Sequence, residues 1–299
     1  YRDLDIARES VMVFTMNFHK YHALGNDYIV LDPAEWTIPL DEAVIRRLCH
    51  RNFGIGSDGI LYGPIPTGTA EFTELTRQVG TNAGADVFCG LRIFNPDGGE
   101  AEKSGNGLRI FSRYLLDSGR VGVDASFGIL TLGGRVESTV LDGGSQVRVS
   151  MGRVSFDADD VPVSGYQGEV LEQLIEVGDE SLKFSAATIG NPHCVVLVED
   201  LSADLAKRLG PPLETHPAFP NRSNVQFMKI LDRHTIAIQI WERGAGYTLA
   251  SGSSASACAA ISRKLGLTDS PIIVKMPGGE LNIDVSDAFD VVMQGPVTR

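Results

Sequence analysis

The sequence predicts an α+β fold of two similar halves, each a curved mixed β-sheet wrapped around one central helix. Strand-like runs rich in β-branched residues recur at short spacing along the 299 residues, whereas helical patterns are few. Two of the predicted helices follow serine turns, Ser104–Gly107 and Ser251–Ser254, one in each half of the chain. Many strands with one central helix per half are typical of an α+β architecture.

The individual elements follow from periodicity. Apolar residues at intervals of three and four predict helices at 40–51, 107–118, 203–209 and 254–265. Apolar and β-branched runs predict strands at 28–31, 128–132, 146–151, 194–197, 224–229, 235–241, 272–275 and 291–293. The stretch 64–89 is polar, rich in Gly and Thr and without sustained periodicity, so it predicts a long loop that covers a cleft or is mobile.

Three features recur in the same order in both halves. Asn95 and Glu242 each follow an aromatic residue and stand nine positions before their serine turn. Asn26 and Asn191 each follow a glycine and lead into an apolar strand-like run. Turns of this composition often simply begin helices. Three matches in register favour a duplicated unit that faces itself across one cleft.

Composition excludes several classes of function. The net charge of −12 and the pI near 4.9 argue against nucleic acid as a partner, because phosphate binding needs a basic surface. No apolar run is long enough to predict a membrane span. The four cysteines have no metal-ligand spacing and no disulfide-dense pattern, which predicts a cytoplasmic protein.

The serine turns predict a carboxylate site. A helix N-terminus presents unpaired N–H groups and the positive end of the helix dipole, and glycine lets a ligand approach the backbone closely. Gly105 and Asn106 in the first turn, with Gly252 and Ser253 in the second, would bind one carboxylate from two sides. The expected ligand is therefore a small molecule that carries a carboxylate.

The chain also resembles a known family. The segments 22–27, 54–59, 94–98, 100–107, 190–194, 224–227 and 242–246 look like those of diaminopimelate epimerases, in that family's order, from about residue 16 to 296. The resemblance implies two similar halves, each a sheet barrel around one helix, with the last strand returning to the first half. The implied domains are an extension at 1–15, a first half at 16–143 together with the tail 294–299, and a second half at 144–293.

The resemblance implies an isomerase that uses no cofactor and no metal. In the family, one cysteine thiolate removes the α-proton of an amino acid and a second thiol delivers a proton from the opposite face. Ser104 and Ser251 occupy the matching positions here. A thiol has a reference pKa of about 8.5 and a helix N-terminus lowers it further, whereas serine starts several units higher and needs an adjacent base.

The positions that resemble the family's substrate-binding residues are of matching type. They are Asn26, Asn95, Asn191, Asn224, Glu242 and Arg243. Arginine suits a carboxylate and glutamate suits an ammonium group, although Glu242 and Arg243 could instead form a structural ion pair. The resemblance also implies a homodimer, since family members often pair.

Three functions remain open at this level. The first is epimerisation of L,L- and meso-diaminopimelate in lysine and cell-wall precursor synthesis, with both serines in the acid/base positions. The second is racemisation, isomerisation or dehydration of another amino acid on the same fold, with His193 or Glu242 as a base. The third is an amino-acid-binding protein without catalytic activity. Asp97 and Tyr247 are weaker candidates, as suited to a turn and to packing as to chemistry.

Overall fold

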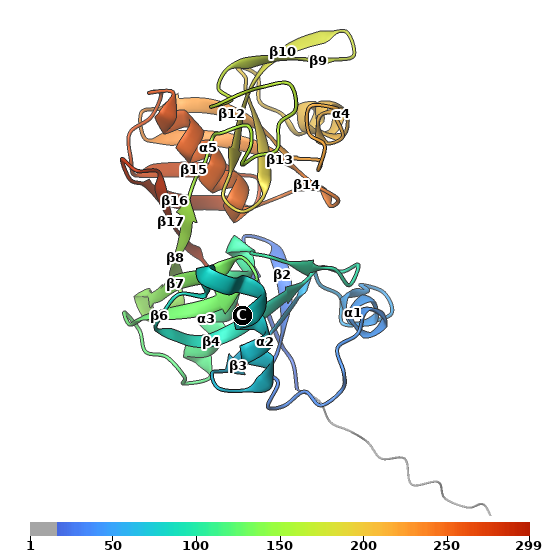
Figure 1. Ribbon diagram of the computed structural model, residues 1–299, viewed down its shortest axis with the longest axis vertical. Helices are drawn as coiled ribbons and strands as arrows, with labels where there is room; N and C mark the ends of the chain where they lie inside the picture. The colour runs from blue at the N-terminus through green and yellow to red at the C-terminus, as the bar shows by residue number, and fades with distance from the viewer. Residues whose placement is uncertain (1–16) are drawn as a thin grey trace, which may run out of the picture.

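The protein folds into two lobes stacked along its long axis, in a computed structural model that describes residues 17–299 (Figure 1). The extension predicted at 1–15 lies outside the described residues. The first lobe contains α1, α2 and α3, and the second contains α4 and α5, while β8 and β17 connect the two. Among the described residues, no helix has both the length and the apolarity that a membrane crossing requires.

The first lobe is built from the following elements: β1 (His19–Ala23), β2 (Asn26–Leu31), α1 (Glu42–Cys49), β3 (Ile60–Pro66), α2 (Ala70–Val79), η1 (Gly80–Ala83), β4 (Val87–Phe94), β5 (Glu100–Ala101), α3 (Gly105–Asp117), β6 (Ser126–Thr131), β7 (Gly134–Leu141), η2 (Asp142–Gly144) and β8 (Gln146–Arg153). The second lobe follows: β9 (Gln173–Val177), β10 (Glu180–Thr188), β11 (Pro192–Leu197), α4 (Ala203–Glu214), β12 (Asn224–Asp232), β13 (Thr235–Glu242), β14 (Gly246–Thr248), α5 (Gly252–Lys264), β15 (Ile272–Met276), β16 (Gly279–Val285) and β17 (Asp290–Pro296).

Strand pairing repeats between the lobes. β2 runs parallel to β3 and β4 parallel to β6, just as β11 runs parallel to β12 and β13 parallel to β15. The main-chain bonds before the two central helices also match. The Gly133 amide donates to the Glu102 carbonyl at 2.8 Å, and the Gly278 amide donates to the Leu249 carbonyl at 2.8 Å. Each acceptor stands two residues before its serine, so the duplication inferred from the motifs is present in the backbone.

The end of the chain returns to the first lobe. β17 pairs with β16 on one side and antiparallel to β8 on the other, from Asp290 opposite Arg153 to Pro296 opposite Gln146. Beyond it, Thr298 bridges to His22 of β1. The division of the chain near residues 143 and 144, with the tail assigned to the first half, remains our proposal.

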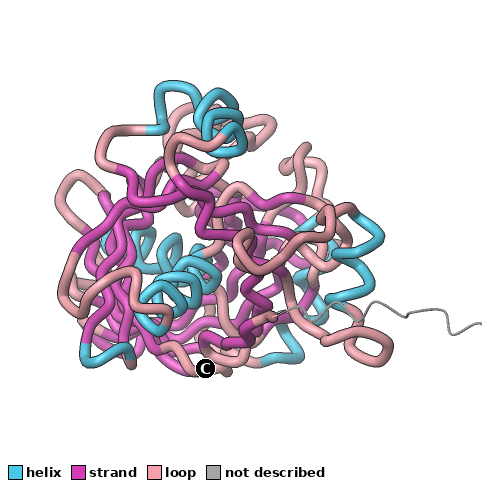
Figure 2. Tube along the Cα trace, turned by 90° about the horizontal axis from the view of Figure 1, so that it is seen from below, coloured by secondary structure: helices cyan, strands magenta, loops and turns pink. Residues whose placement is uncertain are grey.

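One helix fills the centre of each lobe, with strands around it (Figure 2). α3 contacts β1, β2, β3, β7, β8 and β17, and α5 contacts strands from β10 to β17. Both helices are buried around most of their circumference, α3 through large residues such as Phe111 and Leu115 and α5 through an alanine-rich sequence. A helix that is buried on all sides has no single apolar face, which explains the weak amphipathic pattern of α5.

The prediction of a long loop at 64–89 is wrong. This stretch contains the end of β3, the whole of α2 and η1, and the start of β4. Thr69 caps α2 through its hydroxyl, and Phe72 and Leu75 pack with Leu130 of the sheet. Threonine has only modest helix propensity, so tertiary packing rather than composition stabilises this helix. The second lobe lacks an equivalent, because β12 and β13 are joined by a tight turn.

The strand runs named from the sequence are examples, and the structure adds β1, β3, β4, β5, β7, β9, β10, β14 and β16. The four predicted helices are all present, with α4 extending five residues beyond the predicted end at 209 to Glu214.

Candidate functional site

The two central helices meet end to end. A Cβ atom added to Gly105 would lie 3.2 Å from the Cα of Gly252, and the reverse substitution gives the same 3.2 Å. A side chain at either position would push the helix ends apart. Glycine at the first position of both helices therefore permits the approach that the sequence analysis expected from the two serine turns.

Each of these helices is capped by its serine. Ser104 Oγ accepts a hydrogen bond from the Gly107 amide at 3.0 Å, and Ser251 Oγ accepts one from the Ser254 amide at 3.5 Å. A side-chain oxygen at the N-cap satisfies one of the free N–H groups of the first turn. The structure thus brings both predicted catalytic residues to the junction of α3 and α5.

Other donors at this junction remain available. Within residues 17–299, the backbone amides of Asn106 and Ser253 donate to no protein acceptor. Two helix N-termini with free N–H groups favour an anion, since each contributes a partial positive charge. The arrangement can therefore bind a carboxylate and stabilise negative charge that develops beside it.

A tyrosine accompanies the first serine. Tyr28 in β2 is 7% exposed, and its hydroxyl oxygen lies 3.2 Å from Ser104 Oγ. Burial raises the pKa of Tyr28 to about 12, so the hydroxyl is protonated near neutral pH. From the sequence, Tyr28 is expected only as part of the strand at 28–31.

A carboxylate accompanies the second serine. Ser251 is 4% exposed, with its Oγ 3.4 Å from Ser253 Oγ. Burial raises the pKa of half-buried Glu242 at the end of β13, while a hydrogen bond from the Ser251 side chain acts in the opposite direction. The two serines therefore differ in their side-chain partners, the Tyr28 phenol for Ser104 and the Ser253 hydroxyl for Ser251.

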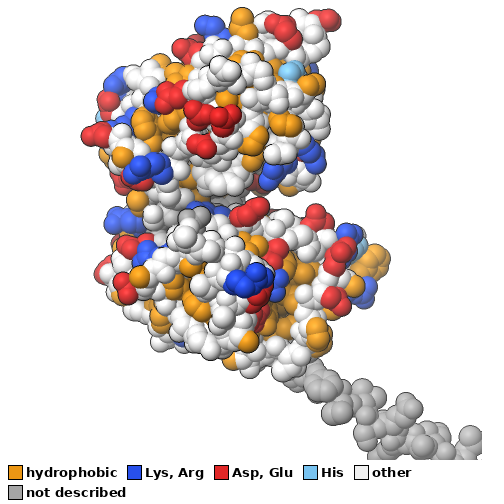
Figure 3. Space-filling view, in the orientation of Figure 1, with side chains coloured by type: hydrophobic (Ala, Val, Ile, Leu, Met, Phe, Trp, Pro, Cys, Tyr) orange, Lys and Arg blue, Asp and Glu red, His pale blue; other side chains and the backbone are white. Residues whose placement is uncertain are grey.

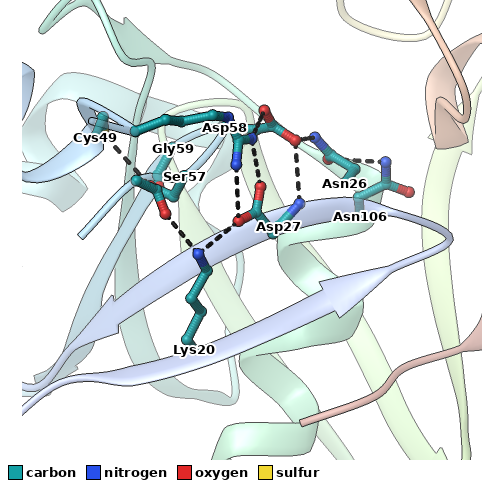
Figure 4. A network of polar contacts seen from close by, with 10 residues as sticks. Lys20, Asn26, Asp27, Cys49, Ser57, Asp58, Gly59 and Asn106 are labelled. Atoms are coloured by element: carbon teal, nitrogen blue, oxygen red, sulfur yellow. Dashed lines mark hydrogen bonds and ion pairs between the residues drawn. The ribbon is translucent and has the colours of Figure 1, made fainter. Parts of the chain in front are cut away.

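Asn26 is held by a polar network that reaches the surface (Figure 4). Its Nδ2 donates to Asp58 at 2.9 Å, and its Oδ1 accepts from Asn106 Nδ2 at 2.9 Å. Arg51 then pairs with Asp58 at 2.6 Å and with Asp27 at 2.7 Å. Asn26 and Asn106, both predicted to be site residues, are thus fixed to each other at the N-terminus of α3.

A buried arginine stands behind the helix junction. Arg109 is fully buried and donates to Asn106 Oδ1 at 2.8 Å and to Met293 Sδ at 3.1 Å. Burial lowers the pKa of its guanidinium, and no carboxylate in the described chain pairs with it. Its charge therefore adds to the positive ends of α3 and α5 without a compensating anion from the protein.

In the second lobe, Asn191 links the serine turn to a histidine. Its Nδ2 donates to Ser253 Oγ at 3.4 Å and its Oδ1 lies 3.0 Å from His193 Nε2. His193 is fully buried, and its Nδ1 has no partner in the described chain. Burial lowers its pKa to about 3, so the ring is neutral and poorly suited to accept a proton.

Asn224 fixes the turn that carries Arg243. Its Oδ1 accepts from the Arg243 amide at 2.9 Å, and its Nδ2 donates to the Pro192 carbonyl at 3.0 Å. Arg243 is exposed and donates to the Asn221 carbonyl at 3.2 Å. No ion pair joins Glu242 to Arg243 in the described residues. The alternative of a structural ion pair between them is therefore absent.

The remaining candidates lie outside this cluster. Asn95 is exposed in the turn after β4, and in the described chain its side chain bonds to none of the other predicted site residues. Asp97 accepts from the Gly99 amide at 2.9 Å, which is a turn interaction. Tyr247 donates to Gln239 at 2.7 Å, and its ring lies under Lys207.

The carboxylate of Glu214 at the end of α4 organises the turn after β13. It is 5% exposed and accepts from Trp241 Nε1 at 2.7 Å and from the Gly244 amide at 2.8 Å, and it also pairs with Arg222. Trp241 and Gly244 are the chain neighbours of Glu242 and Arg243 on either side. No local sequence signal connects α4 to this turn, so the sequence analysis missed the residue.

We expect Glu214→Gln to lower the free energy of unfolding by about 1–3 kcal/mol, because one amide N–H would face donors that the carboxylate now accepts from. Urea denaturation measures this loss. Glu180→Gln is the matched control, since Glu180 pairs with Arg208 at the surface and such pairs contribute about 0–1 kcal/mol. Equal losses in the two variants would show that Glu214 does not organise the turn.

Charged side chains of both signs are spread over both lobes on the face shown in Figure 3, and the surface is notched between the lobes. The sequence and the fold of this chain are both similar to those of known proteins. The diaminopimelate epimerase family matches residues 18–156 and 185–299. Diaminopimelate epimerase 2 of Nostoc sp. is 55% identical over 95% of this chain and 93% of that protein. Diaminopimelate epimerase of Moorella thermoacetica is 36% identical over 95% of this chain and 97% of that protein.

Solved structures confirm the predicted fold class. A hydroxyproline epimerase from Agrobacterium vitis superposes with a TM-score of 0.66 at 15% identity, over 94% of this chain and 90% of that one. A phenazine biosynthesis protein from Bacillus anthracis gives a TM-score of 0.61 at 15% identity, over 95% and 96% of the two chains. At such low identity, these two structures bear on the fold alone.

Proposed function

Because this chain belongs to the diaminopimelate epimerase family, we propose that it interconverts L,L- and meso-diaminopimelate by inverting one α-carbon without a cofactor. The observation that carries the proposal is the meeting of two serine-capped helix N-termini, with Gly105 and Gly252 in contact distance. The curated relatives named above share this family and nearly the full length of the chain.

The reacting carboxylate binds at the helix ends in this proposal. The free amides of Asn106 and Ser253 donate to it, and the helix dipoles with Arg109 stabilise the enolate-like charge that forms when the α-proton leaves. Ser104 and Ser251, one from each helix, exchange protons with opposite faces of the α-carbon. One side removes the proton as the other delivers one, so the configuration inverts.

Serine hydroxyls need help with this chemistry. A helix dipole contributes about 0.3–1 kcal/mol, at most about 2 kcal/mol when partly buried, and one pKa unit corresponds to about 1.4 kcal/mol. The dipole alone therefore leaves both hydroxyls protonated. In our proposal a neighbouring base or a bound water takes the proton that passes through the Ser251 hydroxyl.

The distal amino-acid head is bound by Glu242 and Arg243, with Asn26, Asn95, Asn191 and Asn224 orienting the substrate. Two features support this assignment. Glu242 and Arg243 do not neutralise each other, which leaves an acid for an ammonium and a guanidinium for a carboxylate. Asn26 keeps a second N–H on Nδ2 beyond the one that it donates to Asp58.

The deciding experiment follows α-proton exchange in D₂O by NMR with L,L- and meso-diaminopimelate, for the wild type and for Ser104→Ala and Ser251→Ala. We expect either variant to abolish inversion, while exchange without inversion persists on the face that keeps its serine. Ser112→Ala and Ser262→Ala are matched controls, because these serines lie on the same helices but are buried away from the junction.

The alternatives correspond to other outcomes of this experiment. Exchange confined to a different amino acid would replace diaminopimelate by that substrate on the same fold. Binding of amino acids without exchange in the wild type would identify a non-catalytic binding protein. Full activity in both serine variants would contradict the assigned roles while leaving the reaction intact.

We also propose that the enzyme works in the cytoplasm as a homodimer. The four cysteines are free and buried, which suits a reducing compartment. Light scattering of the purified protein tests the dimer.

A further inference from the structure

The hydroxyl of Tyr28 has one partner in the described chain, and that partner is Ser104. The two oxygens are 3.2 Å apart, and either can be the donor. Ser104 Oγ also accepts from the Gly107 amide at 3.0 Å. If Ser104 gives its own hydrogen to a ligand, the Tyr28 hydroxyl is the one side-chain group among residues 17–299 in position to replace that hydrogen.

The second serine has no such partner. Tyr28 stands two residues after Asn26, and the residue two positions after the matching Asn191 is His193. His193 bonds to Asn191 rather than to Ser251. Ser251 Oγ lies instead 3.4 Å from Ser253 Oγ, and its hydroxyl acts to lower the pKa of Glu242. The duplicated site is therefore unequal in its proton donors and acceptors.

The local structure makes room for the tyrosine ring. A Cβ atom added to Gly59 would lie 2.5 Å from Tyr28 Cε1 and 2.6 Å from the Phe94 carbonyl oxygen. Gly59 follows Asp58, which also holds Asn26, so one short segment shapes both the ring pocket and the asparagine. The ring is 7% exposed and is fixed by its surroundings.

We propose that Tyr28 is a positioning residue and proton relay that acts through Ser104, and this inference rests on the proposed function. When Ser104 delivers its proton to the carbanion, a C–H bond forms at the α-carbon and the Ser104 O–H bond breaks. The Tyr28 phenolic proton moves to Ser104 Oγ in the same step, so the charge ends on a phenolate. After the product leaves, a solvent proton returns to the phenolate through Ser104 Oγ. In the reverse direction each transfer runs backwards.

The relay addresses the weakness of serine as an acid. A phenol has a reference pKa of about 10, well below that of an aliphatic hydroxyl, so the charge left behind is more stable on tyrosine than on serine. Burial raises the pKa of Tyr28 to about 12, which keeps the hydroxyl protonated before each turnover and narrows its advantage over an aliphatic hydroxyl without removing it. A cysteine at position 104 would need no relay, since a thiol is itself acidic enough.

The test is a double-mutant cycle between Tyr28→Phe and Ser104→Cys, read as kcat and KM for epimerisation and as D₂O exchange. We expect Tyr28→Phe to lower kcat by about 100-fold in the wild-type background, with KM nearly unchanged. In the Ser104→Cys background we expect the same substitution to cost less than about threefold, a coupling of about 30-fold between the two positions.

Two controls separate this relay from a structural role. Tyr21→Phe removes the hydroxyl of another buried tyrosine, which bonds to Asp117 at the far end of α3, and should leave kcat within about twofold. Gly59→Ala keeps the Tyr28 hydroxyl but displaces its ring, and should lower kcat with the serine at 104 more than with the cysteine.

The outcomes are distinct from those that test the reaction itself. A wild type without exchange into diaminopimelate overturns the proposed function. A wild type that epimerises, with Tyr28→Phe equally active or with equal losses in both backgrounds, overturns the relay while the proposed function stands.

Discussion

Gly252→Ala is expected to lower epimerase activity by on the order of 100-fold, the cost of a misplacement near 1 Å in a positioned active site. The added Cβ would lie 3.2 Å from the Gly105 Cα and 2.8 Å from Met293 Sδ. Relief requires either that the helix ends separate or that Met293 moves away from Arg109, to which it is hydrogen-bonded at 3.1 Å. Both changes disturb the donors that bind the reacting carboxylate.

Stability should change much less than activity in this variant. Overpacking costs about 1–3 kcal/mol, whereas alanine in place of glycine favours a helix by about 1 kcal/mol. Steady-state kinetics and thermal unfolding of the same preparation measure the two effects. Gly122→Ala is the matched control, because a Cβ there meets no atom within 4 Å. Activity retained in Gly252→Ala would show that close contact of the helix ends is not required.

The central helices were predictable because their signals are local. A serine followed by glycine and then by apolar residues indicates the N-terminus of a helix. The structure has Ser104 and Ser251 as the N-caps, at the positions that these turns indicate. Repetition of the same signal in both halves also predicted that the two helix ends share a site. The structure adds their distance, which no local pattern contains.

The error at α2 has a different origin. Within the segment 70–79, Phe72, Leu75 and Val79 stand at intervals of three and four, which is helical spacing, but the pattern spans only 10 residues of a polar stretch. Those side chains are covered by Leu130 of β6 and Ala83 of η1, which lie outside the helix. A local helical signal was therefore present but short, and the polar composition of the longer stretch 64–89 outweighed it in the prediction.

The supporting residues of the site were beyond local reasoning for a related reason. Tyr28 meets Ser104 and Glu214 meets Trp241 only after the sheet has brought distant segments together. The residue types assigned to substrate binding were predictable, but the hydrogen bonds that these side chains make within the protein were not. Asn224, for example, uses its amide to bond the Arg243 and Pro192 backbones.

His193 is expected to make the protein sensitive to acid. Burial is the main cause that lowers its pKa from 6.5 to about 3, with Arg243 also lowering it and Gln226 opposing. The folded state therefore holds the ring neutral, whereas the unfolded chain binds a proton below about pH 6.5. Since the unfolded state binds more protons in this window, stability is complete above pH 6.5 and falls as the pH drops toward 3.

The expected slope is about 1.4 kcal/mol per pH unit, which amounts to about 3 kcal/mol at pH 4. Carboxylates contribute to acid unfolding in every variant, so the quantity to measure is the difference in unfolding free energy between the wild type and His193→Gln. That difference should change with this slope below pH 6.5 and stay constant above it. His22→Gln, at an exposed histidine, is the control, and the difference in unfolding free energy between the wild type and this variant should change little with pH. A flat difference for His193→Gln across pH 4 to 7 would mean that the buried ring can be protonated in the folded protein. In that case Nδ1, which has no partner among the described residues, must gain an acceptor on protonation, and His193 would regain its place as a candidate base.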